Sequence, residues 1–308
     1  MKVGIMGAGA IGAFIGSVLQ QSGHEVTFIA RGQHLEAIKK NGLIIEANQE
    51  VYKVDGKFSN DPSALSESDL VLFCVKSNDT EETGNRLKNL IKNEANILIL
   101  QNGVDNEEYL SNIFGTERVF SCATYIQSSI LKPGTVKQIG EVNLVIGELM
   151  PTAMNTAQKI AVMFNDSGIN TRHSTKIMNS KWKKYIWNVT FNPLSAAFGV
   201  SVGEILDQKN LLAIAKKINS EVISLAKIQG YHISKSFIDN MFLNTDSENV
   251  RNHKTSMLQD RLNGKQMEIE SLCGYPVRKG KELGVLVPTI ETIYHMLLYI
   301  ERSDSKDN

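Results

Sequence analysis

The sequence predicts an α/β protein in which a doubly wound parallel sheet is followed by an all-helical C-terminal domain. In the first half, short β-rich runs alternate with helical stretches, which is the pattern of βαβ units. After about Arg172 the strand-like runs stop and helical periodicity takes over. The length of 308 residues also exceeds what one hydrophobic core usually serves, which favours two domains.

The individual elements follow from apolar runs and helical spacing. The expected strands are Val3 to Met6, Val26 to Ile29, Leu70 to Val75, Ile97 to Leu100 and Val119 to Thr124. The helices between them are Ile11 to Ser22, Gln33 to Asn41, Thr80 to Ile91 and Asn106 to Ile113. A later stretch, Val136 to Gly147, alternates around Gly140 and predicts an antiparallel hairpin at the sheet edge. The expected helices of the second half are Ile177 to Phe191, Leu211 to Gln229, Ser234 to Leu243 and Thr289 to Ile300.

The overall charge argues against polyanionic partners. Lys plus Arg (33) balances Asp plus Glu (33), so no global field would attract nucleic acid or an anionic membrane surface. No apolar run approaches the roughly 18 residues that span a bilayer, and the N-terminus lacks the apolar core of a signal peptide. We therefore expect a cytoplasmic protein without nucleic-acid or membrane partners.

The cysteines and histidines form no disulfide or metal pattern. Cys74, Cys122 and Cys273 are odd in number, far apart and without a C-x-x-C pair, which is typical of a reducing compartment. The six histidines are scattered along the chain. We expect no metal site, and we interpret the cysteines as small core hydrophobes.

A glycine-rich turn joins the first expected strand to the first expected helix. Its residues are Gly7, Ala8, Gly9, Ala10, Ile11 and Gly12. In a dinucleotide-binding fold, one glycine makes the tight turn, one lets the backbone approach the pyrophosphate, and one lets the helix pack on the strand. The strand, the helix and the second strand lie at the expected places, which favours a Rossmann-type dinucleotide site over a plain glycine-rich turn.

The residue after the second strand bears on the choice of cofactor. An NAD-specific fold normally carries Asp or Glu there to bind the ribose 2'-hydroxyl, and this chain has Ala30-Arg31-Gly32. The guanidinium of Arg31 suits a 2'-phosphate, so the sequence favours NADPH and NADP+. The alternative is a solvated arginine at a strand end.

Two further polar residues follow strands of the same sheet. Lys76 comes directly after Val75, and Asn102 follows the strand that ends at Leu100. Ligands of open α/β sheets bind beyond the carboxyl ends of the strands. Lys76 could therefore balance phosphate charge and Asn102 could bind the nicotinamide half of the cofactor, although either could also be an ordinary loop residue.

A polar stripe runs along an otherwise apolar helix in the second half. Lys184, Asn188 and Asn192 are spaced four residues apart, which places them on one helix face. Buried amides without partners cost on the order of 1 to 3 kcal/mol each, so the protein or a ligand must satisfy them. Pro193 should end or kink this helix. The alternative is a solvated lysine cluster with two asparagines bonded to neighbouring helices.

Further motifs extend this pattern along the chain. In order they are Gly7 to Gly12, Val75-Lys76, Gln101-Asn102-Gly103, Lys184-x3-Asn188-x3-Asn192-Pro193-Leu194, Ser256-Met257-Leu258-Gln259-Asp260 and Glu268-Ile269. With this order and spacing the chain resembles the ketopantoate reductases over essentially its whole length. The resemblance implies an NADPH-dependent reduction of 2-dehydropantoate to pantoate, in the pathway to pantothenate and coenzyme A.

The resemblance also implies roles for single residues. Lys184 would be the proton donor, and Glu268 would line the site near both the substrate and the cofactor. The substrate would be held by Asn188, Asn192 and Ser256. These roles fit the chemistry, because a hydride arriving at a ketone carbon builds negative charge on the oxygen, and a nearby ammonium can stabilise it and give a proton.

The sequence departs from the family pattern at one place. Val202 stands where many family members have Asn before a Gly-Glu pair, which puts one substrate hydrogen bond in doubt. A cofactor contact of the family falls near residues 126–128. Two structural alternatives also stay open: Ser256 could begin a capping box with Gln259, and Glu268 could simply interact with a helix dipole.

These observations predict three segments. Residues 1–172 would form the NADP-binding domain, residues 173–302 the helical substrate and catalytic domain, and residues 303–308 a polar tail. The active site would lie in the cleft between the domains, with a small keto acid as substrate. A reductase of another small 2-keto acid and a non-catalytic NADP(H) sensor are the alternatives, and a homodimer is compatible with the sequence.

Overall fold

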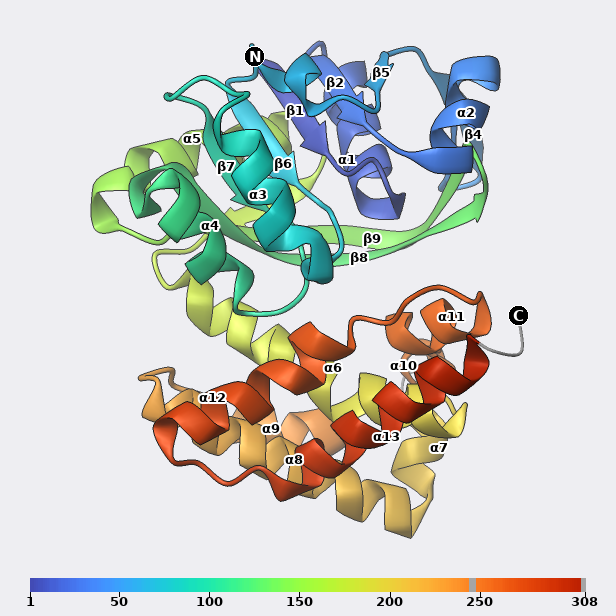
Figure 1. Ribbon diagram of the computed structural model, residues 1–308, viewed down its shortest axis with the longest axis vertical. Helices are drawn as coiled ribbons and strands as arrows, with labels where there is room; N and C mark the ends of the chain where they lie inside the picture. The colour runs from blue at the N-terminus through green and yellow to red at the C-terminus, as the bar shows by residue number, and fades with distance from the viewer. Residues whose placement is uncertain (244–247, 306–308) are drawn as a thin grey trace. The chain divides into compact units, whose positions relative to one another are not determined.

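The computed structural model describes residues 1–243 and 248–305, and the chain divides into two compact units, Met1–Ile177 and Met178–Asn308. The first unit is a sheet covered by helices, and the second unit is helical (Figure 1). The α/β class and the all-helical C-terminal region predicted from the sequence are confirmed.

The first unit is built on one mixed sheet. Its strands are β1 (Lys2–Met6), β2 (Glu25–Ile29), β3 (Leu43–Ala47), β4 (Glu50–Val54), β5 (Lys57–Ser59), β6 (Leu70–Phe73), β7 (Asn96–Ile99), β8 (Val119–Lys132), β9 (Thr135–Glu148) and β10 (Asn170–His173). The strands lie in the order β4-β3-β9-β8-β7-β6-β1-β2-β5, and β10 pairs with β9. From β8 through β7, β6, β1 and β2 to β5, neighbouring strands are parallel.

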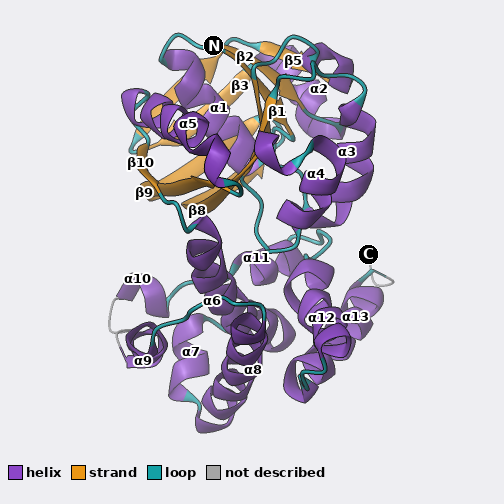
Figure 2. Ribbon diagram, turned by 90° about the vertical axis from the view of Figure 1, so that its left-hand side faces the viewer, coloured by secondary structure: helices purple, strands orange, loops and turns teal. Residues whose placement is uncertain are grey.

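Helices cover both faces of this sheet. They are α1 (Ala10–Gln21), α2 (Gly32–Asn41), α3 (Thr80–Lys88), α4 (Asn106–Phe114) and α5 (Met154–Asp166), with short helical turns η1 (Pro62–Leu65), η2 (Ser77–Asp79), η3 (Thr116–Arg118) and η4 (Pro151–Ala153). Helices α1 and α5 lie on one side of the sheet and α3 and α4 on the other (Figure 2). The sheet is therefore doubly wound.

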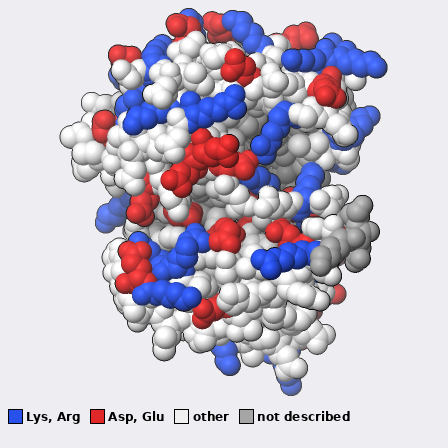
Figure 3. Space-filling model, in the orientation of Figure 1, with Lys and Arg blue, Asp and Glu red and all other residues white. Residues whose placement is uncertain are grey.

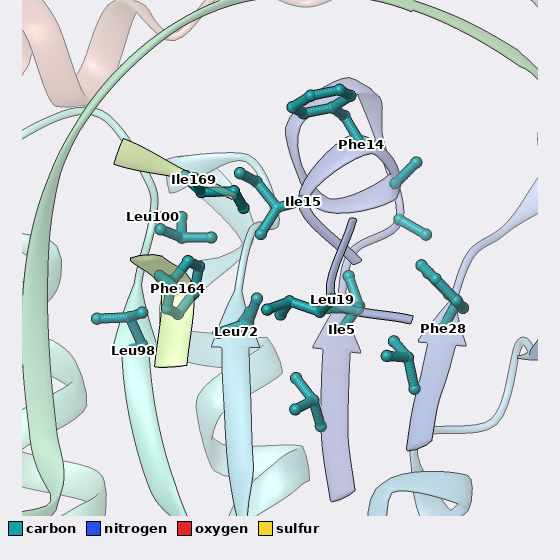
Figure 4. Close-up of a cluster of buried hydrophobic side chains, with 14 of the residues drawn as sticks. Ile5, Phe14, Ile15, Leu19, Phe28, Leu72, Leu98, Leu100, Phe164 and Ile169 are labelled. Carbon is teal, nitrogen blue, oxygen red and sulfur yellow. The ribbon is translucent and has the colours of Figure 1, made fainter. Parts of the chain in front are cut away.

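The central strands alternate between two hydrophobic cores. Leu70 and Leu72 of β6 belong to the core that includes α1 and α5, whereas Val71 and Phe73 belong to the core that includes α3 and α4. Both faces of the strand are buried, which explains why its sequence is a continuous apolar run. Figure 4 shows the first core, where Leu72 lies beneath Ile15 of α1.

The long strands β8 and β9 differ from the sequence-based expectation. β9 is a single strand that pairs antiparallel with β8, and the turn between them lies at Pro133 and Gly134. β9 also pairs with β3 and β10, so it lies inside the sheet. The edge hairpin predicted for Val136 to Gly147 is therefore wrong, because Gly140, at a φ of +74°, is accommodated within the strand.

The second unit consists of helices of unequal length. They are α6 (Ile177–Phe198), α7 (Val202–Asp207), α8 (Lys209–Ile228), α9 (Lys235–Leu243), α10 (Glu248–Arg251), α11 (Ser256–Leu262), the π-helical turn η5 (Glu270–Gly274), α12 (Tyr275–Leu283) and α13 (Pro288–Asp304). Helix α6 passes through Pro193 although the sequence predicts an end or kink there. Phe191 and Leu194 on either side are fully buried, so packing offsets the lost backbone hydrogen bond.

The two ends of the second unit differ from the predicted segment limits. The division of the chain falls at Ile177, beyond Arg172, because β10 still pairs with β9. At the other end, α13 includes Ser303 and Asp304, and the Asp304 carboxylate accepts a hydrogen bond from Arg261 Nε at 2.7 Å. These residues are helical and anchored instead of forming a polar tail, and residues 306–308 lie outside the described residues.

Charged side chains of both signs lie on the face of the molecule shown in Figure 3. On the face shown in Figure 3, basic and acidic groups are interspersed on both units. This distribution agrees with the formal net charge of zero. Among the described residues, every helix falls short of the length or the apolar character that crossing a membrane requires.

Replacing Leu72 with Ala should lower the free energy of unfolding by about 2 to 5 kcal/mol, because the side chain is fully buried between strands and α1. The matched control is Leu131→Ala in β8, whose side chain is 54% exposed and whose loss should cost less than about 0.5 kcal/mol. Denaturant unfolding followed by circular dichroism measures both. Equal losses in the two variants would contradict the assignment of the core.

Candidate active site

The glycine-rich turn lies between β1 and α1 as predicted. The Ala8 backbone N–H donates to the Ile29 carbonyl at 2.7 Å, which ties the turn to the end of β2. Helix α1 begins at Ala10, and Gly9 is its N-cap without a side-chain hydrogen bond. No acidic residue lies in the first turn of α1, so no carboxylate in that turn would repel an anion from the N–H groups at this helix end.

The three glycines meet three different steric requirements. Gly7 has a φ of +102°, and a Cβ there would lie 2.9 Å from the Val75 backbone nitrogen. A Cβ on Gly12 would overlap the Gly7 carbonyl oxygen, whereas a Cβ on Gly9 would meet nothing within 4 Å. Gly7 and Gly12 are therefore required by the protein itself. Gly9 faces open space, as expected of the glycine that lets a pyrophosphate approach the backbone.

Two further residues, Ser128 and Cys74, adjoin the turn. Ser128 of β8 donates its hydroxyl to the Ala10 carbonyl at 3.1 Å, which places the 126–128 segment against the start of α1. Cys74 lies directly against the turn, and burial raises the pKa of its thiol. The thiol therefore stays protonated, which agrees with its interpretation as a packing residue.

Arg31 lies at the end of β2, where the sequence places it, and it has an acidic partner. It is the N-cap of α2, and its Nη2 lies 2.7 Å from Oδ2 of Asp79 in η2. The Arg31 side chain is 86% exposed and the Asp79 side chain 34% exposed. Sequence reasoning missed Asp79, because only the parallel pairing of β1 with β2 and β6 brings η2 next to the end of β2.

Lys76 and Asn102 lie on adjacent, tightly connected segments. Lys76 is the N-cap of η2, and the hydroxyl of Ser77 donates to the Asn102 carbonyl at 3.2 Å. Asn106 also donates to this carbonyl, at 2.7 Å, and accepts a hydrogen bond from the buried hydroxyl of Thr80 at 2.8 Å. The structure thus brings the segments of Lys76 and Asn102 together at the carboxyl edge of the sheet.

The second unit carries the polar stripe on α6. Lys184 and Asn188 are partly buried, and Asn192 is 3% exposed. Asn192 Nδ2 lies 3.4 Å from the hydroxyl oxygen of Ser256 at the start of α11. Two of the three residues expected to hold the substrate are therefore in contact, although they are far apart in the sequence.

Ser256 is not the cap of its helix. Thr255 is the N-cap of α11, and its hydroxyl accepts from the Leu258 N–H at 3.3 Å. The Gln259 side chain instead donates to the Lys254 carbonyl. The alternative in which Ser256 forms a capping box with Gln259 is therefore wrong, because the cap lies one residue earlier.

A buried aromatic cluster holds α6 against the segment that follows Glu268. The hydroxyl of Tyr185 donates to the Leu272 carbonyl in η5 at 2.9 Å, and the Tyr185 ring contacts the rings of Trp182 and Tyr275 edge-on. Glu268 lies two residues before η5, and its carbonyl accepts from the Leu272 N–H. A π-helical turn such as η5 is often found at functional sites.

Val202, the departure from the family pattern, is fully buried at the start of α7. Its backbone N–H donates to the His253 carbonyl at 3.1 Å. Ser201 and Glu204 form a reciprocal capping box around it. The side chain at this position packs into the helical unit. Within the described residues, no group of three or more His, Cys, Asp or Glu side chains is arranged to hold a metal ion.

A glycine turn at the carboxyl edge of a parallel sheet, followed by a helical unit with a polar stripe, is typical of oxidoreductases that use a nicotinamide dinucleotide. The comparison with protein families specifies this class further. The model of "Ketopantoate reductase PanE/ApbA" matches residues 3–151, and the model of its C-terminal part matches residues 176–301. The chain belongs to the ketopantoate reductase family.

Individual proteins agree with this assignment. A 2-dehydropantoate 2-reductase of Pyrococcus horikoshii is 33% identical over 290 residues, covering 94% of this chain and 93% of the relative. The crystal structure of a PanE/ApbA family ketopantoate reductase from Ralstonia eutropha matches with a TM-score of 0.92 and 32% identity, covering 99% of this chain and 100% of that one. A D-mandelate dehydrogenase with NADH and anilino(oxo)acetate matches with a TM-score of 0.93 and 27% identity, over 99% of this chain and 100% of that one.

The glycine geometry predicts a separation of stability from cofactor binding. Gly9→Ala should leave the free energy of unfolding within about 0.5 kcal/mol of wild type, since its Cβ meets open space, yet weaken dinucleotide binding about tenfold or more. Gly12→Ala should destabilise the fold, because its Cβ overlaps backbone. Thermal melting and fluorescence titration with NADPH and NADH measure the two effects. Wild-type affinity in Gly9→Ala would contradict the placement of the pyrophosphate.

Proposed function

We propose that the protein catalyses the NADPH-dependent reduction of 2-dehydropantoate to pantoate, a step toward pantothenate and coenzyme A. The observation that carries the proposal is the contact of Asn192 with Ser256, on the helix that also carries Lys184. The proposal assigns cofactor binding to the first unit and substrate binding to the second. The relatives named 2-dehydropantoate 2-reductase support the same reaction.

The chemistry assigned to Lys184 is proton donation. The bound cofactor would supply a hydride to the ketone carbon. Negative charge then develops on the ketone oxygen, and the Lys184 ammonium both stabilises this charge and transfers a proton to it. The helix that carries Lys184 is held by the Tyr185 hydroxyl and its aromatic neighbours, so the backbone from which the Lys184 side chain extends is fixed.

The remaining polar groups of the second unit bind and orient the substrate. The amides of Asn188 and Asn192 and the hydroxyl of Ser256 can each donate or accept hydrogen bonds, which suits the carboxylate and the hydroxyl of a 2-keto hydroxy acid. Asn192 is buried, so a substrate group that pairs with it gains more than it would in water. Glu268 is assigned to bind the substrate hydroxyl and to orient Lys184.

Three residues of the first unit are assigned to the cofactor. Arg31 would bind the 2'-phosphate of NADPH, since its guanidinium matches a phosphate in shape and charge. Lys76 would balance phosphate charge, and Asn102, whose backbone is fixed by Asn106, would bind the nicotinamide half. The free helix end at Gly9 would meet the pyrophosphate.

A second candidate is a reductase of another small 2-keto acid. The matching D-mandelate dehydrogenase supports it, because it shows that this fold can serve another 2-hydroxy acid. Mandelate carries an aromatic ring where pantoate has a branched hydroxyalkyl chain. The apolar Val202 in place of Asn removes one hydrogen-bonding group from the family pattern.

The two candidates differ in substrate preference. With purified protein and NADPH, 2-dehydropantoate should be reduced with the highest kcat/KM of a panel that includes phenylglyoxylate, pyruvate and 2-ketoisovalerate, as measured by the loss of NADPH absorbance. A higher kcat/KM for phenylglyoxylate would favour the second candidate. Tight NADPH binding without turnover of any keto acid would indicate a sensor.

Replacing Lys184 with Ala should lower kcat about 100- to 10,000-fold, because the proton donor and the charge stabilisation are lost together. The dissociation constant for NADPH should stay within about twofold, since Lys184 is not assigned to the cofactor. The control is Lys183→Ala on the same helix, whose ammonium lies over the Phe237 ring at 5.9 Å and should not affect turnover. Near-normal turnover in Lys184→Ala would rule out its role as proton donor.

A further inference from the structure

The end of β2 lacks the acid of an NAD-specific fold, yet the structure places a carboxylate there. Asp79 Oδ2 lies 2.7 Å from Nη2 of Arg31, the residue assigned to the 2' position of the adenosine ribose. The carboxylate comes from η2, which follows β6, so no inspection of the β2 end alone reveals it.

The fold holds Asp79 in this position. Met6 of β1 pairs with Ile29 of β2 on one side and with Phe73 of β6 on the other. The segments that follow β2 and β6 therefore flank the glycine turn that follows β1. The Asp79 N–H donates to the Lys76 carbonyl at 2.9 Å, which closes the turn of η2. The next residue, Thr80, is buried and bonded to Asn106, which anchors the end of η2.

The two partners differ in how firmly they are held. The Asp79 side chain is 34% exposed on a short, anchored turn, whereas the Arg31 side chain is long and 86% exposed. Arg31 can therefore swing away from Asp79 at little cost, while the carboxylate stays near the 2' position. An exposed ion pair of this kind contributes only about 0 to 1 kcal/mol, so a ligand can readily replace one partner.

We propose that Asp79 is a specificity-determining residue that allows the protein to use NADH beside NADPH. Its carboxylate accepts a hydrogen bond from the 2'-hydroxyl of NADH, the role that an acid at the end of β2 has in NAD-specific folds. For NADPH, the same carboxylate repels the 2'-phosphate and competes with it for Arg31. The proposal rests on the proposed function only in placing the adenosine ribose beside Arg31.

The test measures cofactor binding in the absence of substrate. Asp79→Asn keeps the size of the side chain and removes its charge. The ratio of the dissociation constants of NADH and NADPH should rise about tenfold, the equivalent of about 1.4 kcal/mol, through tighter NADPH binding and weaker NADH binding. Fluorescence titration of the full chain with each cofactor gives both constants. A ratio within twofold of wild type would overturn the proposal.

Two further variants separate a local effect from a general change of charge. Glu25→Gln removes the same charge from an exposed pair with Lys57 at 2.7 Å, at the opposite end of β2, and should leave the ratio unchanged. Arg31→Ala should weaken NADPH binding far more than NADH binding. In the Arg31→Ala background, Asp79→Asn should still weaken NADH binding, because the hydrogen bond to the 2'-hydroxyl does not need Arg31. An equal shift in Glu25→Gln, or no weakening in the double variant, would overturn the proposal.

The outcomes distinguish this proposal from the proposed reaction. If the ratio shifts as expected and 2-dehydropantoate is not reduced, only the assigned substrate is wrong. If 2-dehydropantoate is reduced and the ratio does not respond to Asp79→Asn, the role of Asp79 is wrong.

Discussion

The parallel pairing of β1 with β2 on one side and β6 on the other is the constraint on which the cofactor half of the molecule depends. Parallel strands end at the same edge, so this pairing places Gly7, Arg31 and Lys76 around one point although they are far apart in sequence. The register cannot slip, because a shift of one residue would exchange Leu72 and Phe73 between the two cores. The hydrophobic cores therefore determine the geometry of the polar edge.

The helical unit must also hold polar side chains in fixed positions, and it does so through packing and hydrogen bonds between helices. A polar stripe on a mostly buried helix is costly unless its groups are hydrogen-bonded, and apolar contacts elsewhere on the helix can offset part of that cost. Trp182 and Tyr185 supply these contacts, and the Tyr185 hydroxyl bonds to backbone carbonyls of η5. The same interaction holds the segment that follows Glu268, so the elements carrying Lys184 and Glu268 are fixed together. This arrangement leaves the amide of Asn192 beside Ser256.

The sequence predicts best those elements whose pattern is local. The five predicted strands and the glycine turn were found because apolar runs and glycine spacing are visible within a few residues. The strands β3, β4, β5 and β10 were missed because they are short or carry charged and polar residues, and they form only by pairing with strands distant in sequence. The long strand β9 was mistaken for a hairpin because a glycine in a strand and a glycine in a turn look alike in sequence.

Site residues follow the same division between local and non-local signals. Lys184, Asn188 and Asn192 were proposed as site residues from their spacing on one helix, and the contact of Asn192 with Ser256 could be expected only from the family resemblance. Asp79 was missed because its importance depends on its ion pair with Arg31, which lies on a different strand-to-helix connection of the sheet. A chain with zero net charge can still discriminate between a 2'-phosphate and a 2'-hydroxyl, because discrimination depends on the difference between two local interactions. Arg31 and Asp79 present both a donor and an acceptor at one position, so in the proposed role of this pair the cofactor preference would depend on which partner the ligand displaces.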